Sequence, residues 1–391
     1  MPELSNSTTL KFYNSATVQL YNSRTLKLFF PIGSFYPAQI GGPDNIMYWH
    51  AKALHQRGHT IWVTTTDDGI GPDVPLDQWL DRDCGRVIYV KTAVHYAPLK
   101  LLIRSLGPLW NCDVVHFSAI FYPISWLLAP LAILLGKKIV WTPHGELDPD
   151  ALIYSPARKR PILRLVRLFR KRVLFHSTCD AETEYIKTNF GADTRIVQMP
   201  YFMELPAQLP RTSGNFWLYV GRIHPKKAIE RLIEALPLVR VKKPLKIVGD
   251  DNGDYGRGLH ELAQKLGLNG QVEFVGHKRG DEKYQLMADA DCLIMPSHTE
   301  NFGIVVTEAL TQQTPAIAST GTPWQILHDR NVGDWVANTP EAIAQAMNRI
   351  ADLPPADYEI LRQNAGQLVR EEFDIAPNIH RWETVYKNLL G

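Results

Sequence analysis

The stretch FWLYVGRIHPKKAIERLIEALPLVRVKKPLKIVGD (residues 216–250) contains the two patterns on which the fold depends. It begins with the apolar run FWLYVGRI (216–223) and ends with a second one, LKIVGD (245–250). Between them, IERLIEALPLVR (229–240) has apolar residues at helical spacing. Strands that are apolar on both faces and are joined by a helix are typical of a parallel sheet covered on both sides. We therefore expect a strand–helix–strand unit with a right-handed crossover.

The same alternation runs along almost the whole chain. Further strand-like runs are LKLFFPIG (26–33), TIWVTTT (60–66), RVIYVKT (86–92), DVVHFS (113–118), KKIVWTPH (137–144), VLFHST (173–178), RIVQMP (195–200), VEFVGH (272–277), CLIMPS (292–297) and PAIAST (315–320). Helical patterns fill the gaps between these runs. The sequence therefore predicts an α/β fold of the doubly wound kind.

The alternation breaks at PYFMELPAQLPRTSG (200–214), which contains three prolines and a polar tail. A linker there would separate two halves of similar size, each long enough for its own core. We expect an N-terminal extension at 1–24, a Rossmann-like domain at 25–203, a linker at 204–214, a second Rossmann-like domain at 215–375, and a C-terminal helix at 376–391 that returns to the first domain. Two such domains would face each other across a cleft.

Composition excludes several classes of protein. The 42 Lys and Arg residues balance 40 Asp and Glu residues, whereas a nucleic-acid-binding protein usually has a large basic excess. The four scattered cysteines predict a reduced, cytoplasmic protein without disulfides or a zinc site. Residues 117–136 are uncharged and long enough to span a bilayer, but Pro123, Pro130 and the strand-like run DVVHF that leads into them argue against a span. A buried strand followed by a buried helix explains the segment equally well.

The densest group of polar residues is MPSHTENFGIVVTE (295–308), directly after a strand. Glu300 and Asn301 lie in the expected loop, and Glu308 lies about one turn into the helix that follows. The backbone N–H groups of Phe302, Gly303 and Ile304 would form an anion site at the start of this helix. The two carboxylates could accept hydrogen bonds from hydroxyls on either side of a diphosphate. A capping glutamate and a solvated helix glutamate would also fit the pattern.

Three other loops follow strands. In GRIHPKKA (221–228), Arg222 and Lys227 could neutralise a leaving diphosphate, although surface charges are the alternative. Gly41 and Gly42 precede a helical pattern and could approach a phosphate, but they do not form the glycine fingerprint of nicotinamide-binding proteins. In TPHGE (142–146), His144 would point into the cleft or have a structural role.

Together these motifs resemble glycosyltransferase family 4, the retaining enzymes of the GT-B fold. The glutamate pair Glu300 and Glu308, the basic stretch with Arg222 and Lys227, Gly41-Gly42 and the PHG of His144 occur in that family's order from about residue 26 to the C-terminus. One departure is Ala228, where the family usually has glycine.

The resemblance implies roles for these residues. Arg222 and Lys227 would hold the diphosphate, Glu300 the donor sugar, and Glu308 the ribose. His144 would lie near the anomeric carbon, with Gly145 and Glu146 on the acceptor side. The remaining donor-binding positions would be Gly41, Gly42, Asn301, Phe302, Gly303, Ile304 and, beside the base, Val275, His277 and Lys278. The co-substrate would be a UDP- or GDP-type sugar, no metal or other cofactor would be needed, and transfer would be a front-face substitution.

Residues 158–172, RKRPILRLVRLFRKR, contain eight Lys and Arg residues and no acidic residue. Apolar residues from Ile162 to Val173 follow helical spacing, and Arg164, Arg167 and Lys171 line another face. We expect peripheral contact with an anionic membrane, which would suit a lipid-linked or glycan acceptor. A packed helix with a solvated basic face is the alternative.

Three other functions fit parts of the pattern. A GT-B relative could be an epimerase or phosphorylase, and an inactive protein could bind a sugar nucleotide without transferring it. A nicotinamide-dependent dehydrogenase is disfavoured because its glycine fingerprint is missing.

Overall fold

The computed structural model describes residues 9–11, 25–38, 42–92, 98–212 and 214–391. The chain divides into two compact units. The N-terminal unit combines Met1–Glu204 with Ile375–Gly391, and the C-terminal unit is Leu205–Asp374. The sequence predicts domains at 25–203 and 215–375 with a linker at 204–214, whereas the structure has the unit boundary between Glu204 and Leu205.

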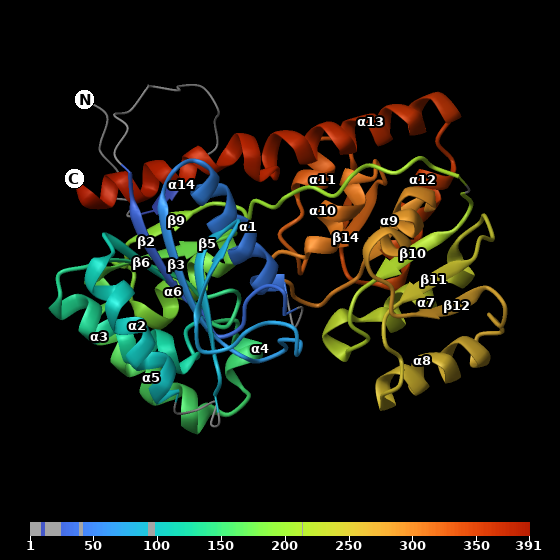
Figure 1. The fold of residues 1–391 in the computed structure, drawn as a ribbon. Helices are drawn as coiled ribbons and strands as arrows, with labels where there is room; N and C mark the ends of the chain where they lie inside the picture. The colour runs from blue at the N-terminus through green and yellow to red at the C-terminus, as the bar shows by residue number, and fades with distance from the viewer. Residues whose placement is uncertain (1–8, 12–24, 39–41, 93–97, 213) are drawn as a thin grey trace, which may run out of the picture. The chain divides into compact units, whose positions relative to one another are not determined.

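The N-terminal unit is built on a sheet of nine described strands (Figure 1), in the order β1-β9-β8-β7-β6-β2-β3-β5-β4. The strands are β1 (Thr9–Lys11), β2 (Lys27–Pro31), β3 (Thr60–Thr66), β4 (Trp79–Arg82), β5 (Gly85–Val90), β6 (Val114–Ser118), β7 (Lys138–Thr142), β8 (Val173–Ser177) and β9 (Ile196–Gln198). Neighbouring strands are parallel except β4, which pairs antiparallel with β5.

Helices cover both faces of this sheet because its central strands are buried on both sides. In β2, Leu28 and Phe30 belong to one core, with α1 (Gly42–Gln56) and α14 (Ile375–Leu390), whereas Phe29 belongs to a second core, with α2 (Leu99–Asn111), α3 (Pro123–Leu134), α5 (Pro156–Phe169) and α6 (Asp180–Phe190). The helices of this unit are α1 (Gly42–Gln56), α2 (Leu99–Asn111), α3 (Pro123–Leu134), α4 (Pro149–Leu152), α5 (Pro156–Phe169), the 3-10 turn η1 (Arg170–Arg172), α6 (Asp180–Phe190) and α14 (Ile375–Leu390). Figure 1 shows α14 beside α1, with which it is in contact.

The C-terminal unit contains a six-stranded parallel sheet in the order β12-β11-β10-β13-β14-β15. Its strands are β10 (Trp217–Val220), β11 (Leu245–Val248), β12 (Val272–Gly276), β13 (Cys292–Met295), β14 (Ala316–Ser319) and β15 (Gly333–Val336). Its helical elements are η2 (Pro225–Lys227), α7 (Ile229–Ala235), η3 (Leu236–Leu238), α8 (Asp254–Lys265), α9 (Gly280–Asp289), α10 (Ile304–Thr311), α11 (Ile326–Asp329), α12 (Pro340–Ala351) and α13 (Pro355–Glu372).

The predicted doubly wound α/β fold is confirmed in both units. The structure also contains strands that the sequence analysis missed, namely β1, β4 and β15, and β4 corrects the expectation of an all-parallel sheet. The helix expected at 158–172 is α5 followed by the 3-10 turn η1, and Val173, which was included in the helical spacing, instead begins β8. Within the expected N-terminal extension, the described residues Thr9–Lys11 pair with β9.

The uncharged run 117–136 is divided between two elements. It contains the end of β6 and then α3, whose residues Ile124, Leu128 and Ala132 are buried against the sheet. Within the described part of the chain, no helix combines the length and the apolar character that crossing a membrane requires. The four cysteines are free thiols.

Candidate functional site

The motifs of the C-terminal unit meet at the point where its strand order reverses. From β10, the chain first moves outward through β11 and β12, then returns to β13 on the other side of β10. Ligands of doubly wound sheets bind outside the carboxyl ends of the strands at such a switch point. The loop after β10 carries Arg222 and Lys227, and the loop after β13 carries Glu300. A backbone hydrogen bond of 2.9 Å from His298 N to Lys226 O joins the two loops.

Lys227 and Glu300 form an ion pair, in which Nζ of the lysine contacts Oε2 of the glutamate. Both side chains are mostly buried. The main chain brings Lys227 there through η2 and through Ala228, which follows with φ +49°. This left-handed backbone conformation gives a physical reason for a glycine at this position, because a Cβ atom disfavours it.

Glu308 lies on α10 and is nearly fully buried. Its Oε1 accepts a hydrogen bond of 2.6 Å from Lys283 Nζ, and the Tyr284 hydroxyl lies 3.5 Å away. Lys283 and Tyr284 both lie on α9. A carboxylate held by one lysine retains oxygen lone pairs that can accept hydrogen bonds from ligand hydroxyls.

The start of α10 is held in place by its neighbours. Gly303 precedes the helix with φ +82°, and a Cβ atom at this position would lie 2.8 Å from Met295 Sδ. The Phe302 carbonyl accepts a hydrogen bond of 2.5 Å from Trp324 Nε1, and Glu300 N donates to Gly321 O at 3.1 Å. Together with Ile304 and Asn301, these residues form a short loop of fixed backbone before the helix N-terminus, an arrangement that favours anions.

The remaining predicted donor-binding residues of this unit are Arg222, in the same loop as Lys227, and three residues in and after β12. Arg222 is exposed and has no ion-pair partner among the described residues, and its carbonyl accepts a 2.9 Å hydrogen bond from the Tyr219 hydroxyl. Val275 lies in β12, two strands away from β10. In the following loop, His277 accepts a hydrogen bond from Arg279, and Lys278 forms an ion pair of 3.3 Å with Glu282.

In the N-terminal unit the strand order reverses at β2, with β3 on one side and β6 on the other. His144 follows β7 and adopts φ +55°. Its ring is fixed at both nitrogens, since Nε2 lies 2.8 Å from Ser118 Oγ and Nδ1 lies 2.6 Å from the Tyr201 hydroxyl. Burial lowers the pKa of His144 to about 3, so its imidazole is neutral near pH 7.

The two residues after His144 anchor this loop. Gly145 N donates to Glu182 Oε1 at 2.8 Å, and the Glu146 carboxylate accepts hydrogen bonds from Ile120 N at 2.5 Å and Phe121 N at 3.1 Å. Burial raises the pKa of Glu146 to about 7. Gly42 begins α1, whereas its predicted partner Gly41 lies outside the described residues.

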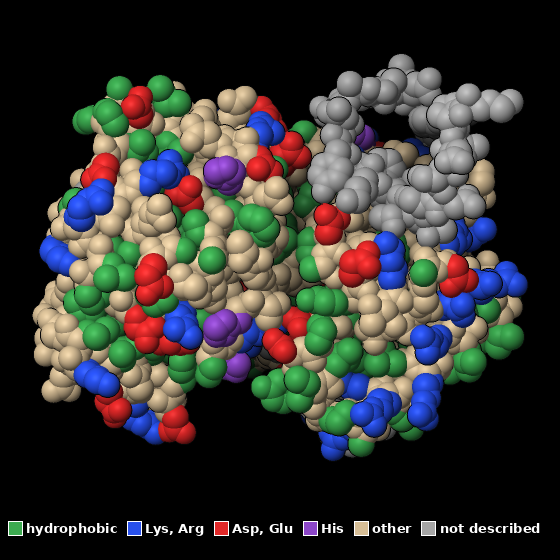
Figure 2. Space-filling model, turned by 180° about the vertical axis from the view of Figure 1, so that it is seen from behind, with side chains coloured by type: hydrophobic (Ala, Val, Ile, Leu, Met, Phe, Trp, Pro, Cys, Tyr) green, Lys and Arg blue, Asp and Glu red, His purple; other side chains and the backbone are tan. Residues whose placement is uncertain are grey.

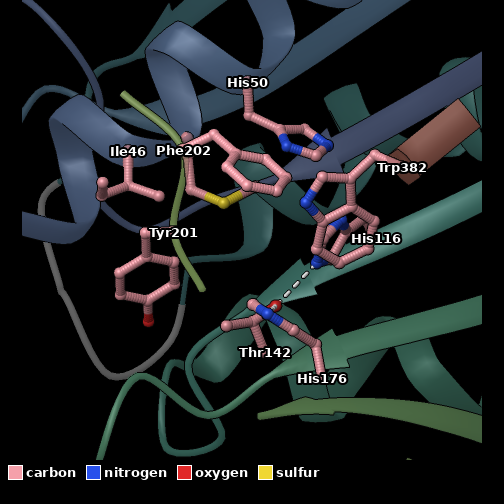
Figure 3. A pocket seen from close by; sticks show the side chains of 9 residues that line it. Ile46, His50, His116, Thr142, His176, Tyr201, Phe202 and Trp382 are labelled. Atoms are coloured by element: carbon pink, nitrogen blue, oxygen red, sulfur yellow. Dashed lines mark hydrogen bonds between the residues drawn. The ribbon is translucent and has the colours of Figure 1, made fainter. Parts of the chain in front are cut away.

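A small cavity of about 10 Å³ lies beside this loop in the N-terminal unit (Figure 3), with room for about one water molecule. Its lining includes side chains from α1, the central strands and α14: Ile46, Met47, His50, His116, Thr142, His176, Tyr201, Phe202 and Trp382. Among the described residues, no group of three or more His, Cys, Asp or Glu side chains is arranged to hold a metal ion.

A chain of hydrogen bonds runs along this cavity. His176 Nε2 lies 2.8 Å from the Met199 carbonyl, which can only accept, so this nitrogen carries the proton. The direction of the remaining bonds follows. The Thr142 hydroxyl donates to His176 Nδ1, His116 Nε2 donates to the Thr142 hydroxyl, and the Tyr386 hydroxyl donates to His116 Nδ1. The chain ends at His50, whose Nε2 lies 2.6 Å from that hydroxyl. His176 and His116 therefore each donate through one ring nitrogen and accept at the other, as a neutral imidazole does, and His50 donates to the Tyr386 hydroxyl.

The sequence analysis missed the partners that fix the predicted residues. Lys283 and Tyr284 on Glu308, and Ser118 and Tyr201 on His144, carry no local signal of their role. Glu182 does carry a signal, because it lies soon after the end of β8, and ligands of doubly wound sheets bind beyond the carboxyl ends of strands. It accepts a hydrogen bond from the backbone N–H of Thr178.

Two family models match the chain. Glycosyl transferases group 1 matches residues 204–368, and Glycosyltransferase Family 4 matches residues 40–202. A glycogen synthase of Mycobacterium tuberculosis is 31% identical over 308 residues, which cover 73% of this chain and 70% of that protein. The chain belongs to the family 4 glycosyltransferases.

Two further proteins are similar to this glycosyltransferase. An uncharacterized glycosyltransferase of Methanocaldococcus jannaschii is 36% identical over 177 residues, and this match covers 44% of our chain but only 43% of the relative. The crystal structure of Anabaena Alr3699/HepE in complex with UDP and glucose has a TM-score of 0.73 at 20% identity, covering 93% of this chain and 100% of that one. The two Rossmann-like units therefore have the GT-B fold.

Proposed function

We propose that this glycosyltransferase moves a sugar from a nucleotide-diphosphate sugar to an acceptor hydroxyl, with retention of anomeric configuration. The observation that carries the proposal is the Lys227–Glu300 ion pair at the switch point of the C-terminal sheet. A cation and a carboxylate side by side match a donor whose diphosphate is anionic and whose sugar presents hydroxyl groups.

The residues of the C-terminal unit divide the donor between them. Arg222 and Lys227 bind the diphosphate, and the backbone N–H groups at the start of α10 add to this anion site. Glu300 accepts hydrogen bonds from the sugar hydroxyls, and the Asn301 side chain can both donate and accept. Glu308, oriented by Lys283, accepts hydrogen bonds from the ribose, and the loop at Val275–Lys278 borders the base.

The reaction is a front-face substitution. The acceptor hydroxyl oxygen bonds to the anomeric carbon on the side from which the diphosphate leaves, and the broken C–O bond leaves its electron pair on the diphosphate. The acceptor proton passes to an oxygen of the departing diphosphate. Arg222 and Lys227 stabilise the negative charge that develops, so that we expect transfer without a metal ion. His144, held by Ser118 and Tyr201, lies near the anomeric carbon as a neutral imidazole.

We propose UDP or GDP as the nucleotide, and a glycan or a lipid-linked molecule as the acceptor. The complex of Alr3699/HepE with UDP and glucose supports testing UDP-glucose first. We place the reaction in the cytoplasm, at the inner face of a membrane that residues 158–172 contact peripherally.

The test begins with thermal shift against UDP- and GDP-sugars, followed by release of nucleoside diphosphate with and without maltoheptaose or a lipid extract. We expect release that depends on the acceptor, a product whose anomeric configuration by NMR equals that of the donor, and activity that persists in EDTA. Arg222→Ala should lower turnover about 10²–10³-fold while the protein stays folded. Conversion of the donor without transfer would indicate an epimerase instead.

A further inference from the structure

Large apolar side chains are exposed together on one part of the N-terminal unit. Among the described residues, eight of the thirteen exposed large apolar side chains lie between residues 99 and 168. They are Leu99, Ile103, Leu106, Trp110, Leu134, Ile153, Tyr154 and Leu168. They come from α2, α3, α5 and the segment before α5. Single exposed apolar residues are ordinary on a protein surface, but a cluster marks a place of interaction.

Helix α2 is apolar on two opposite faces. Leu101 and Leu109 are buried against the sheet, as a surface helix requires. On the other side, Leu99, Ile103, Leu106 and Trp110 recur at intervals of four, three and four residues. Their exposed fractions are 66%, 66%, 43% and 68%. A surface helix usually has one apolar face toward the core and a polar face toward water, so a second apolar stripe on the solvent side indicates a contact with something other than water.

The three helices form one surface. Helix α2 packs against α3, and α3 packs against α5, all on the same face of the sheet (Figure 1). Leu134 at the end of α3 and Leu168 on α5 are 82% and 84% exposed, so each of the three helices presents large apolar side chains to solvent.

Basic side chains surround these apolar ones. Residues 98–172 contain twelve Lys and Arg but four Asp and Glu, a net charge of 12 − 4 = +8, and of the acidic residues Asp148 is buried and Glu146 is half-buried. The rest of the chain is net negative, with 30 Lys and Arg against 36 Asp and Glu. Figure 2 shows Lys and Arg gathered over the lower part of the N-terminal unit, where α5 lies, with hydrophobic side chains among them.

We propose that the α2–α3–α5 surface binds an anionic lipid bilayer, with the outer stripe of α2 immersed among the lipid headgroups. It rests on the membrane contact proposed above and adds the hydrophobic anchor to it. Basic residues on α5 face the lipid phosphates, while Ile103, Leu106 and Trp110 enter the interface. Stable membrane binding needs two signals, and this surface supplies both an apolar and a basic one.

A second copy of the chain fits this surface less well. A two-fold symmetric contact would bring the same patch of each copy together. Residues 98–172, which form this surface, have a net charge of +8 in each copy, so that the contact would be opposed by repulsion of like charges. An anionic bilayer instead attracts every basic residue of the patch.

The experiment measures binding of the full chain to vesicles of phosphatidylcholine with 30% phosphatidylglycerol, and to vesicles of phosphatidylcholine alone. We compare the wild type with an apolar variant, Ile103→Ser/Leu106→Ser/Trp110→Ser, and a basic variant, Arg160→Gln/Arg164→Gln/Arg167→Gln. The control is Leu238→Ser/Ile360→Ser, which removes two comparably exposed apolar side chains from the C-terminal unit.

We expect the wild type and the control to bind the anionic vesicles equally. The apolar variant should bind at least tenfold more weakly, and the basic variant about 100-fold more weakly at low salt. High salt should abolish the difference between the basic variant and the wild type but not the deficit of the apolar variant. The difference fluorescence between the wild type and Trp110→Phe should shift to the blue on anionic vesicles.

Equal binding by the apolar variant and the wild type, or no blue shift of Trp110, would overturn the proposal. So would a wild-type dimer in solution that the apolar variant converts to a monomer without any vesicle binding. A thermal shift with UDP on the same variants reports donor binding separately. A failed membrane test with an intact UDP response therefore leaves the transferase proposal standing.

Discussion

The ammonium group of Lys227 is paired with the carboxylate of Glu300, a residue 73 positions later in the chain, across the two central strands of the C-terminal sheet. The loop geometry behind this contact is set by left-handed residues on both sides, Ala228 and Gly303. The pair neutralises two mostly buried charges, which would be costly to leave alone. A diphosphate that binds Lys227 must therefore share it with Glu300 or displace the carboxylate.

We predict that Glu300→Gln binds free UDP or GDP about tenfold more tightly than the wild type, while sugar transfer falls by two orders of magnitude or more. Removing the carboxylate ends its competition for Lys227 but also removes the acceptor of sugar hydroxyls. Isothermal titration with the nucleotide and a turnover assay give the two values. The control is Glu282→Gln, which changes an exposed ion pair with Lys278. Weaker nucleotide binding by Glu300→Gln would contradict this account.

A second prediction concerns Glu308 and its partner. Lys283→Met leaves a nearly buried carboxylate without its cation, so we expect the free energy of unfolding to fall by about 2–4 kcal/mol. The double variant Lys283→Met/Glu308→Gln should recover at least half of this loss. Lys278→Met, which breaks a more exposed pair, should cost less than about 1 kcal/mol. Urea denaturation measures all three, and a double variant no more stable than Lys283→Met would exclude the pairing.

The turn before α10 allows a third prediction. Gly303→Ala places a Cβ atom at φ +82°, 2.8 Å from Met295 Sδ and 3.3 Å from Glu300 Cγ. We expect a loss of about 1–3 kcal/mol in stability together with lower turnover, because Glu300 must move. Gly253→Ala is the matched control, since no other atom lies within 4 Å of its Cβ position. Full activity of Gly303→Ala would show that the position of Glu300 is unimportant.

The buried histidines predict acid sensitivity. Burial lowers the pKa of His50 to about 3 and that of His176 to about 4, and it lowers the pKa of His116 as well. Between pH 6.5 and about 4 the unfolded chain therefore binds protons that the folded chain excludes. The contribution of these histidines to stability is full above pH 6.5 and is lost as the pH falls through this window, by up to about 1.4 kcal/mol per pH unit for each histidine.

Urea denaturation at pH 7, 6 and 5 measures this dependence. His50→Gln should reduce the slope of stability against pH, whereas His328→Gln, at an exposed position in the C-terminal unit, should leave it unchanged. Stability that stays constant from pH 7 to 5 would contradict the neutral hydrogen-bonded chain from Met199 to Tyr386.

The sequence alone predicts the parts of this molecule that are local. The central strands are apolar on both faces, and the residues of the GRIHPKKA and HTENFG loops follow such strands directly, so that both the fold and these loops could be inferred. Strands β4 (WLDR) and β15 (GDWV) are short and carry charges, which hides them from a search for apolar runs. Val173 was assigned to the helical pattern although it begins β8, because a single apolar residue fits the spacing of a helix and of a strand equally well.

Contacts between distant segments could not be predicted in this way. Nothing in the spacing of residues indicates that Lys283 meets Glu308, that Tyr201 and Ser118 hold His144, or that Tyr386 of α14 completes the histidine chain. These contacts depend on the order of strands in each sheet and on the docking of α14, which single residues do not encode.

A crystal structure of the full chain with bound UDP or GDP tests the central claim most directly. We predict that the β-phosphate lies within hydrogen-bond distance of Arg222, Lys227 and the backbone at the start of α10, with the ribose hydroxyls on Glu308. A nucleotide bound away from the carboxyl ends of β10 and β13, or a phosphate without contact to Arg222 and Lys227, would contradict it.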